Sequence, residues 1–203
     1  MKEKKFFNIV LLGAPGSGKG TQAALLAKHY NLIHFSTGVL FRHEIELETA
    51  IGKEAKILIN NGNYCPDNMT LNMLNEHISA NKEADGFIFD GVPRTLQQAE
   101  MMDGINYPHP ISVTLVINLQ IDDQKITQRI EKRYQEEGRT DDQLKILPQR
   151  IKNYHSLTKP LIDYYSRQKR LVQVNGMKCI EEVFQDIIVK IDEFLETIQL
   201  QKS

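Results

Sequence analysis

Short apolar runs alternate along this chain with longer segments in which apolar residues recur every three or four positions. The short runs are rich in β-branched and aromatic residues, which is typical of strands buried within a parallel sheet. They predict strands at residues 6–12, 33–35, 87–89, 113–117 and 171–174, and the second of these has the weakest pattern. The longer segments predict helices at residues 18–30, 37–47, 52–60, 67–80, 96–102, 122–136, 142–168 and 180–198.

Strands that alternate with helices indicate crossover connections, which produce a parallel sheet with helices on both faces. We therefore predict an α/β fold whose ligands bind at the carboxyl ends of the strands. The helical segment between residues 36 and 65 is longer than one crossover requires, so we expect a small helical subdomain there. Two prolines lie within the predicted helix 142–168; Pro148 should mark a boundary and Pro160 a kink.

The composition is that of an ordinary globular protein and excludes only a few classes of protein. The 203 residues, of which 41% are hydrophobic and 25% charged, suffice for one well-buried domain. The net charge of −1 provides no general attraction to nucleic acid or to a membrane surface. Two cysteines are too few for a disulfide framework or a structural zinc site, and no apolar stretch approaches transmembrane length. These features predict a cytoplasmic protein.

Residues 13–21 read Gly-Ala-Pro-Gly-Ser-Gly-Lys-Gly-Thr and directly follow the first apolar run. The glycines let the backbone curve with its N–H groups inward, Lys19 adds a positive charge, and the next helix directs its positive dipole end to the same place. The flanking strand and helix favour a polyphosphate nucleotide site over the alternative, an ordinary glycine-rich turn. Gly20 stands where the generic motif has Ser or Thr for magnesium, so the ion must be held differently, for instance through waters.

Asp90 ends the apolar run 87–89, which places a carboxylate near this phosphate cradle. Such a carboxylate suits magnesium, directly or through water, although an aspartate that merely caps the next turn is the alternative. Arg94 follows closely, and a guanidinium at this strand end suits bidentate phosphate binding.

A second cationic group lies further along the chain. Arg129 and Arg133 are four residues apart and therefore share one helix face, while Arg139 and Arg150 follow. A solvated helix face is the alternative interpretation. We favour a role at the phosphates, because phosphoryl transfer depends on positioning and on positive charge around the transferring group.

Further motifs lie downstream of the cradle: Ser36-Thr37-Gly38 with Arg42, Gly-Asn-Tyr-Cys-Pro-Asp at residues 62–67, Asp-Gly-Val-Pro-Arg-Thr at residues 90–95 with Gln98, and Arg-Thr-Asp-Asp at residues 139–142. They occur in the order and spacing of adenylate kinases, and the chain resembles this family from about residue 7 to about residue 194. The resemblance implies one P-loop NTPase-type domain over residues 1–203, with a nucleoside-monophosphate-binding subdomain at about residues 36–65 and a lid at about residues 129–140. Only residues 133–139 separate the lid arginines, so this resembles the short-lid form, which has no room for a cysteine zinc site.

The resemblance also implies roles for individual residues. The ATP site would consist of Gly16, Ser17, Gly18, Lys19, Gly20, Thr21, Arg129, Arg133, Met177 and Lys178. The AMP site would consist of Thr37, Arg42, Asn63, Tyr64, Cys65, Gly91, Arg94, Gln98, Arg139 and Arg150, with Gln98 on the adenine and residues 63–65 contributing backbone. The catalytic residues would be Lys19, Arg94, Arg129, Arg139 and Arg150, and Asp90 would hold magnesium through water.

The activity implied is the reversible, Mg²⁺-dependent conversion of ATP and AMP to two ADP by direct in-line transfer in a monomer. Val39 stands where the family usually has aspartate, which removes one acceptor for the magnesium waters and predicts altered magnesium dependence. A UMP/CMP kinase is the alternative within the class, and Thr37 and Thr95 favour AMP over it. A non-catalytic nucleotide sensor is the alternative from another class.

Overall fold

The computed structural model of the chain describes residues 7–104 and 112–200. Its sheet has five strands in the order β2-β3-β1-β4-β5, and the neighbouring strands pair in parallel. The strands are β1 (Ile9–Gly13), β2 (Ile33–Ser36), β3 (Phe87–Asp90), β4 (Leu115–Gln120) and β5 (Leu171–Asn175). This arrangement confirms the predicted α/β class and each predicted strand, although the start of the first lies outside the described residues. The fourth begins later than predicted, at Leu115, where pairing with Ile9 starts.

The helices agree with most of the predicted segments to within a few residues. They are α1 (Lys19–Tyr30), α2 (Thr37–Glu46), α3 (Ala50–Asn60), α4 (Asp67–Ala80), α5 (Leu96–Asp103), α6 (Asp123–Glu137), α7 (Leu147–Asn153), α8 (Pro160–Arg167) and α9 (Ile180–Leu200). None of those in the described part of the chain is long and apolar enough to cross a bilayer.

The single helix predicted for residues 142–168 is wrong. The chain there forms a 3₁₀ turn at Thr140–Asp142, then α7, a π-helical turn at Tyr154–Thr158, and α8. Pro148 lies in the first turn of α7, which confirms a boundary there. Pro160 has no N–H to donate, and the preceding Lys159 donates its N–H to the Tyr154 carbonyl, five residues back, at 2.8 Å. Before the proline the helix therefore forms one wider, π-helical turn, in which the hydrogen bond spans five residues instead of four, and not only a kink.

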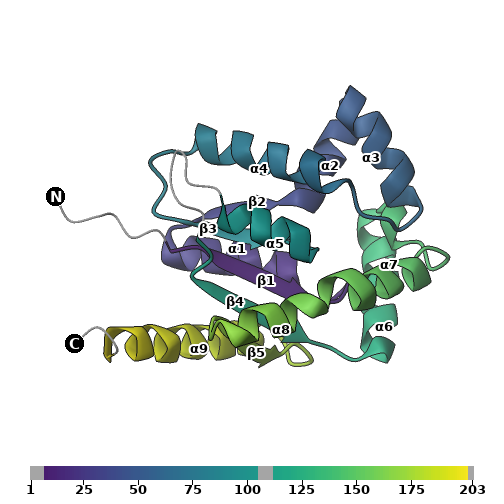
Figure 1. Cartoon of the computed structure of the whole chain (residues 1–203). Coiled ribbons are helices and arrows are strands. Elements are labelled where there is room, and N and C mark those ends of the chain that lie inside the picture. Colours follow the sequence, from purple (N-terminus) through teal and green to yellow (C-terminus); the bar gives the residue numbers. More distant parts are fainter. Residues whose placement is uncertain (1–6, 105–111, 201–203) are drawn as a thin grey trace.

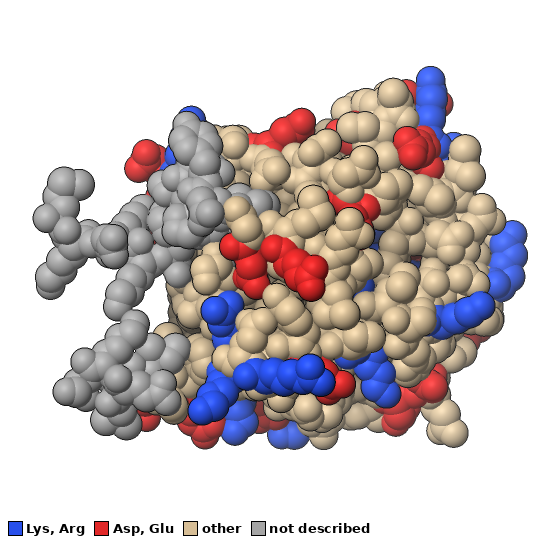
Figure 2. Space-filling view, in the orientation of Figure 1, with Lys and Arg blue, Asp and Glu red and all other residues tan. Residues whose placement is uncertain are grey.

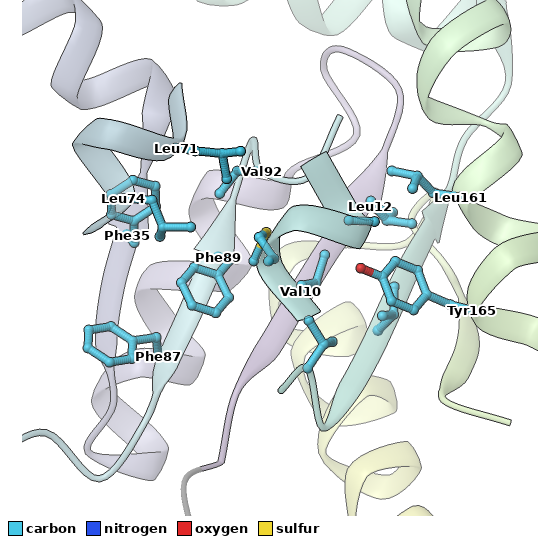
Figure 3. Close-up of a cluster of buried hydrophobic side chains, with 14 of the residues drawn as sticks. Val10, Leu12, Phe35, Leu71, Leu74, Phe87, Phe89, Val92, Leu161 and Tyr165 are labelled. Carbon is cyan, nitrogen blue, oxygen red and sulfur yellow. The ribbon is translucent and has the colours of Figure 1, made fainter. Parts of the chain in front are cut away.

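Helices cover both faces of the sheet because the strands alternate their side chains with a period of two. Val10 and Leu12 of β1 join α4, α5 and α8 in one buried cluster (Figure 3). Ile9 and Leu11, which alternate with these residues along the strand, pack against α1 and α9 in a second buried cluster. Figure 1 shows these two layers of helices on opposite sides of the strands. The residues of β1 are thus buried on both faces, as its continuous apolar run predicts.

Two helical pairs extend past the carboxyl ends of the strands, at the right of Figure 1. The first, α2 and α3, packs around Phe41, Ala55 and Cys65. A Cβ at Gly52 would lie 2.0 Å from the Glu44 carbonyl oxygen, so only glycine permits this close approach of the two helices. The second pair, α6 and α7, packs against the turn after β1 through a small cluster: Ala14, Ile126, Ile130 and Leu147. The strand ends therefore lie between two structural units that rest on the core.

Candidate functional site

The turn between β1 and α1 is the segment that the sequence predicts to bind phosphate. Gly13, Gly16 and Gly18 have φ angles of 150°, 75° and 94°, which side-chain-bearing residues rarely adopt. A Cβ at Gly13 would also lie 2.9 Å from the Leu119 carbonyl oxygen on the neighbouring strand. α1 begins at Lys19, so its unpaired N–H groups and positive dipole end face the turn. The geometry is that of an anion site.

Lys19 lies inside this turn. Its Nζ donates to the carbonyl oxygens of Gly13 at 2.7 Å and Ala14 at 3.0 Å. The pKa of Lys19 is lowered to about 7, mainly by burial and also by the charges of nearby arginines, and the charge of Asp90 only partly opposes this. A bound polyphosphate would reverse this by placing negative charge beside the ammonium group.

The residues predicted for AMP line one cavity, called here the α2 cavity. Its lining includes Thr37, Arg42, Asn63, Tyr64, Cys65, Gly91, Arg94, Gln98, Arg139 and Arg150. These residues come from α2, the segment before α4, the turn after β3, α5 and the region around α7. The tertiary structure therefore joins segments that are far apart in the sequence.

A second cavity, called here the P-loop cavity, lies over the cradle. Its lining includes Gly16, Gly18, Lys19, Gly20, Thr21, Asp90 and Arg133. Ser17, also predicted for ATP, is buried below it. The remaining predicted ATP residues lie outside its lining: Arg129 donates to the Gly176 carbonyl at 2.8 Å, beside Met177, and Lys178 pairs with Asp186 at 2.6 Å.

Four arginines line both cavities: Arg42, Arg94, Arg139 and Arg150. This set is called here the arginine junction. Burial lowers the pKa of Arg42 and of Arg150, and neighbouring arginines act in the same direction. Concentrated positive charge of this kind is favourable only when anions neutralise it. On the outer surface, by contrast, Figure 2 shows acidic and basic side chains both present across the face in view.

Two aspartates that the sequence analysis left without a role hold several of these arginines. Asp142, only 1% exposed, accepts from Arg133 Nε at 2.6 Å and from Arg133 NH2 at 2.8 Å. It also accepts from Arg150 NH1 at 2.6 Å, and Arg139 Nε lies 3.5 Å from its other oxygen. Asp141 adds a contact of 3.2 Å with Arg150. The acidic pair that begins two residues after Arg139 was the available signal, but the sequence does not identify the arginines that this pair would bind.

The Arg133–Asp142 pair is stabilised by its own charges. Burial would raise the pKa of Asp142, but the hydrogen bond from Arg133 and the charges of Arg133, Arg139 and Arg150 lower it. Burial would lower the pKa of Arg133, but the hydrogen bond to Asp142 and the negative charge of that carboxylate outweigh burial and raise it. Both groups therefore stay ionised at neutral pH, and the arginines are held in place in the absence of nucleotide.

Gln98 is fixed by hydrogen bonds at both ends of its amide. Its Oε1 accepts from the Arg94 N–H at 2.6 Å, and its Nε2 donates to Asp67 Oδ1 at 2.7 Å. Thr95 Oγ1 donates to the other oxygen of Asp67 at 3.1 Å. A carboxylate accepts and an N–H donates, so these partners determine which way the amide points. Asp67 is thus a further residue of the site that was not predicted.

Asp90 lies between β2 and the cradle, where a magnesium ion on a nucleotide would be expected. Its Oδ2 accepts from Ser36 Oγ at 3.3 Å and lies 3.9 Å from His34 Nε2. Burial would raise its pKa, but the nearby His34 ring and the positive charges of Lys19 and Arg94 lower it, so Asp90 is ionised. The described residues contain no cluster of three or more His, Cys, Asp or Glu side chains placed to hold a metal. A single carboxylate facing a phosphate cradle fits an ion bound through waters and phosphate oxygens.

Val39 lines the P-loop cavity with 56% of its surface exposed. It presents methyl groups where a polar side chain could accept hydrogen bonds from water around an ion. Cys65 lines the α2 cavity, and burial raises the pKa of its thiol to about 11. The Cys65 thiol is therefore protonated at neutral pH.

Comparison with known proteins agrees with this geometry. The sequence model of the family described as adenylate kinase matches residues 11–170. A protein named adenylate kinase from Parabacteroides distasonis is 41% identical over 177 residues, which cover 87% of this chain and 93% of that protein. Another from Flavobacterium psychrophilum is 43% identical with the same coverage. A third, from Porphyromonas gingivalis, is 38% identical over 92% of this chain and 96% of that protein.

Proposed function

The chain belongs to the adenylate kinase family and is a nucleoside monophosphate kinase with adenylate kinase activity, and from this premise we propose how its residues perform the reaction. ATP occupies the P-loop cavity and AMP occupies the α2 cavity, with their phosphates meeting at the arginine junction. The observation that carries this proposal is that Arg42, Arg94, Arg139 and Arg150 line both cavities. The phosphates of ATP and AMP can approach each other only where such positive charge offsets their repulsion.

On the ATP side, the N–H groups of the cradle from Gly16 to Thr21 bind the phosphates, and Lys19 follows the transferring group. Arg129 and Arg133 close over the nucleotide from α6, and the adenine rests near Arg129 and the backbone of Met177 and Lys178. The hydrogen bond of Arg129 to the Gly176 carbonyl supports this, because it already links α6 to the turn after β5.

On the AMP side, Arg42 and Arg94 bind the acceptor phosphate, and Arg139 and Arg150 bridge the two phosphates during transfer. Gln98 hydrogen-bonds the adenine, Thr37 lies beside the base, and the backbone of Asn63, Tyr64 and Cys65 with Gly91 completes the pocket. Their common place in the lining of the α2 cavity supports these roles. Transfer needs no covalent intermediate, since in-line positioning and charge stabilisation suffice.

The family implies Mg²⁺ with the nucleotide, and when bound the ion neutralises charge on the phosphate oxygens. We propose that Asp90 holds its water ligands. The buried, ionised carboxylate beside Gly20 and the cradle supports this role. No structural zinc is included in the proposal.

We propose that residues 36–65 form a mobile AMP-binding subdomain and residues 129–140 a short lid. Closure of both would bring the arginines onto the phosphates and expel water that could otherwise hydrolyse ATP. In support, α2 and α3 lie within the first range, and the C-terminal part of α6 lies within the second. We also propose a cytoplasmic monomer, on the basis of the family and the two free cysteines, Cys65 and Cys179. Light scattering on the purified protein and fractionation of cells test the last two points.

Steady-state rates with AMP, UMP, CMP and GMP as acceptors, measured over a magnesium titration, test the substrate assignment. We expect AMP to give the highest kcat/KM. A preference for UMP would instead assign the α2 cavity to a pyrimidine nucleotide. Tight binding of ATP and AMP without production of ADP would indicate a sensor.

A further inference from the structure

Three hydrogen bonds fix the main chain and the Nε atom of Arg94. Its N–H donates to Gln98 Oε1 at 2.6 Å, its carbonyl accepts from Thr158 Oγ1 at 2.9 Å, and its Nε donates to the Gly91 carbonyl at 2.8 Å. Among the described residues, no carboxylate forms an ion pair with it. Its terminal nitrogens NH1 and NH2 therefore stay available at the arginine junction.

The Arg94 guanidinium lies over the ring of Tyr64. Arg94 Cζ lies 4.7 Å from the centre of that ring, a distance at which a cation is attracted to the aromatic face. A guanidinium held in this way can still present its terminal N–H groups for bidentate binding of phosphate. Tyr64 thus controls an orientation that the three hydrogen bonds alone leave open.

The ring of Tyr64 is itself held by the π-helical turn between α7 and α8. Its hydroxyl lies 3.0 Å from Thr158 Oγ1. The Thr158 hydroxyl proton is used for the Arg94 carbonyl, so Tyr64 is the donor to Thr158. Thr158 is buried at the end of the π-helical turn before Pro160. The widened turn, Tyr64 and Arg94 form one connected unit.

We propose that the Tyr64 side chain is a positioning residue for the acceptor phosphate, because its ring orients the Arg94 guanidinium and the hydroxyl bond to Thr158 holds the ring. This rests on the proposed assignment of Arg94 to the AMP phosphate and adds a role for the side chain of Tyr64, in addition to its backbone. A guanidinium oriented in advance loses less freedom on binding, so the ring increases affinity for AMP specifically.

The experiment compares AMP affinity, measured by calorimetry, with KM for AMP, KM for ATP and thermal stability. We expect Tyr64→Leu to weaken AMP binding about 3- to 10-fold, the range for a cation–π contact, with KM for ATP unchanged. Tyr64→Phe, which keeps the ring, should restore most of the affinity. Tyr164→Leu is the matched control, because Tyr164 is also half-buried and its hydroxyl bonds another helix at Asp103, outside the site. It should lower the melting temperature without changing AMP affinity.

A double-mutant cycle separates this inference from the assignment on which it rests. Tyr64→Leu should have no further effect on AMP affinity in an Arg94→Ala background. Unchanged AMP binding in Arg94→Ala would overturn the assignment of Arg94. If Arg94→Ala loses AMP affinity but Tyr64→Leu keeps wild-type affinity, only the role of Tyr64 is overturned. An equal loss of ATP and AMP binding in Tyr64→Leu would overturn that role as well.

A measurement on the wild-type protein does not depend on any variant folding. NMR of the free enzyme should show the side-chain protons of Arg94 shifted upfield by the ring current of Tyr64. Arg94 side-chain shifts at ordinary values would show that the ring does not hold the guanidinium and would overturn the proposal.

Discussion

The ionisation of Lys19 is strongly changed by the fold. With a pKa of about 7 in the free protein, the Lys19 side chain is mostly neutral at a pH above 7. An adjacent triphosphate favours its charged form. We therefore expect ATP binding at pH 8 to take up a proton, and the uptake should vanish at pH 6, where Lys19 is already charged. Calorimetry in two buffers of different ionisation enthalpy measures this.

The control is Lys19→Met, which should bind ATP without the Lys19-linked proton uptake and lower kcat by about a hundredfold, the scale for removing a preorganised charge. Proton uptake that persists unchanged in Lys19→Met would contradict the assignment.

The lowered pKa of Lys19 also predicts how stability depends on pH. Between pH values of about 7 and the ordinary pKa of 10.5, the unfolded chain binds this proton and the folded chain does not. The contribution of Lys19 to stability therefore increases as pH rises through that window.

Val39 offers a second test at the scale of one residue. Its exposed side chain lines the P-loop cavity and has no atom that can accept a hydrogen bond from an ion's water shell. We expect Val39→Asp to lower the magnesium concentration for half-maximal activity severalfold, because outer-shell acceptors strengthen metal binding. Val39→Asn, of similar size but uncharged, should give a smaller change. Identical magnesium curves for all three proteins would show that position 39 does not face the ion.

At the scale of elements, Asp142 links α6 to α7 through Arg133 and Arg150. Asp142→Asn leaves these half-buried arginines without their main counter-charge, so we expect the unfolding free energy of the nucleotide-free enzyme to fall by about 3 kcal/mol. Urea denaturation at pH 7 measures this. Glu137→Gln, which removes an exposed partner of Arg139, should change stability far less.

The pH dependence of this link follows from the lowered pKa of Asp142. Its stabilisation is fully present above the ordinary value of 3.8 and is lost as pH falls through the lower pKa of the folded protein. The stability difference between wild type and Asp142→Asn should therefore shrink below about pH 4. A difference that stays constant down to pH 2 would contradict ion pairing at Asp142.

At the scale of the whole molecule, the two units beyond the strand ends should close on the nucleotides. Fluorophores at Ile57→Cys on α3 and Gln135→Cys on α6 should approach each other when ATP and AMP analogues bind together. Exposed Cys179 must first be replaced by Ser, while buried Cys65, with its raised pKa, reacts poorly. A pair at Met101→Cys and Val189→Cys, both exposed on core helices, should keep its distance. Equal transfer efficiency with and without nucleotides would exclude closure.

Local pattern was sufficient wherever one segment determines its own conformation. Apolar runs predicted the strands, and the glycines with Lys19 predicted the cradle, since both depend on neighbouring residues alone. The helix predicted for residues 142–168 was wrong because the effect of a proline depends on how the turn before it rearranges. Widening that turn places Thr158 against Tyr64 and Arg94.

The sequence by itself determined most of the elements, the glycine-rich turn before α1 and, through its motifs, the family. Only the tertiary structure decided which side chains meet: the four arginines between two cavities, Asp142 beneath three of the cations, and the Tyr64 ring under Arg94. The physical reason is that periodicity and backbone preference act over a few residues. Convergence of charges tens of residues apart depends on the order of the strands and on helices packed across them.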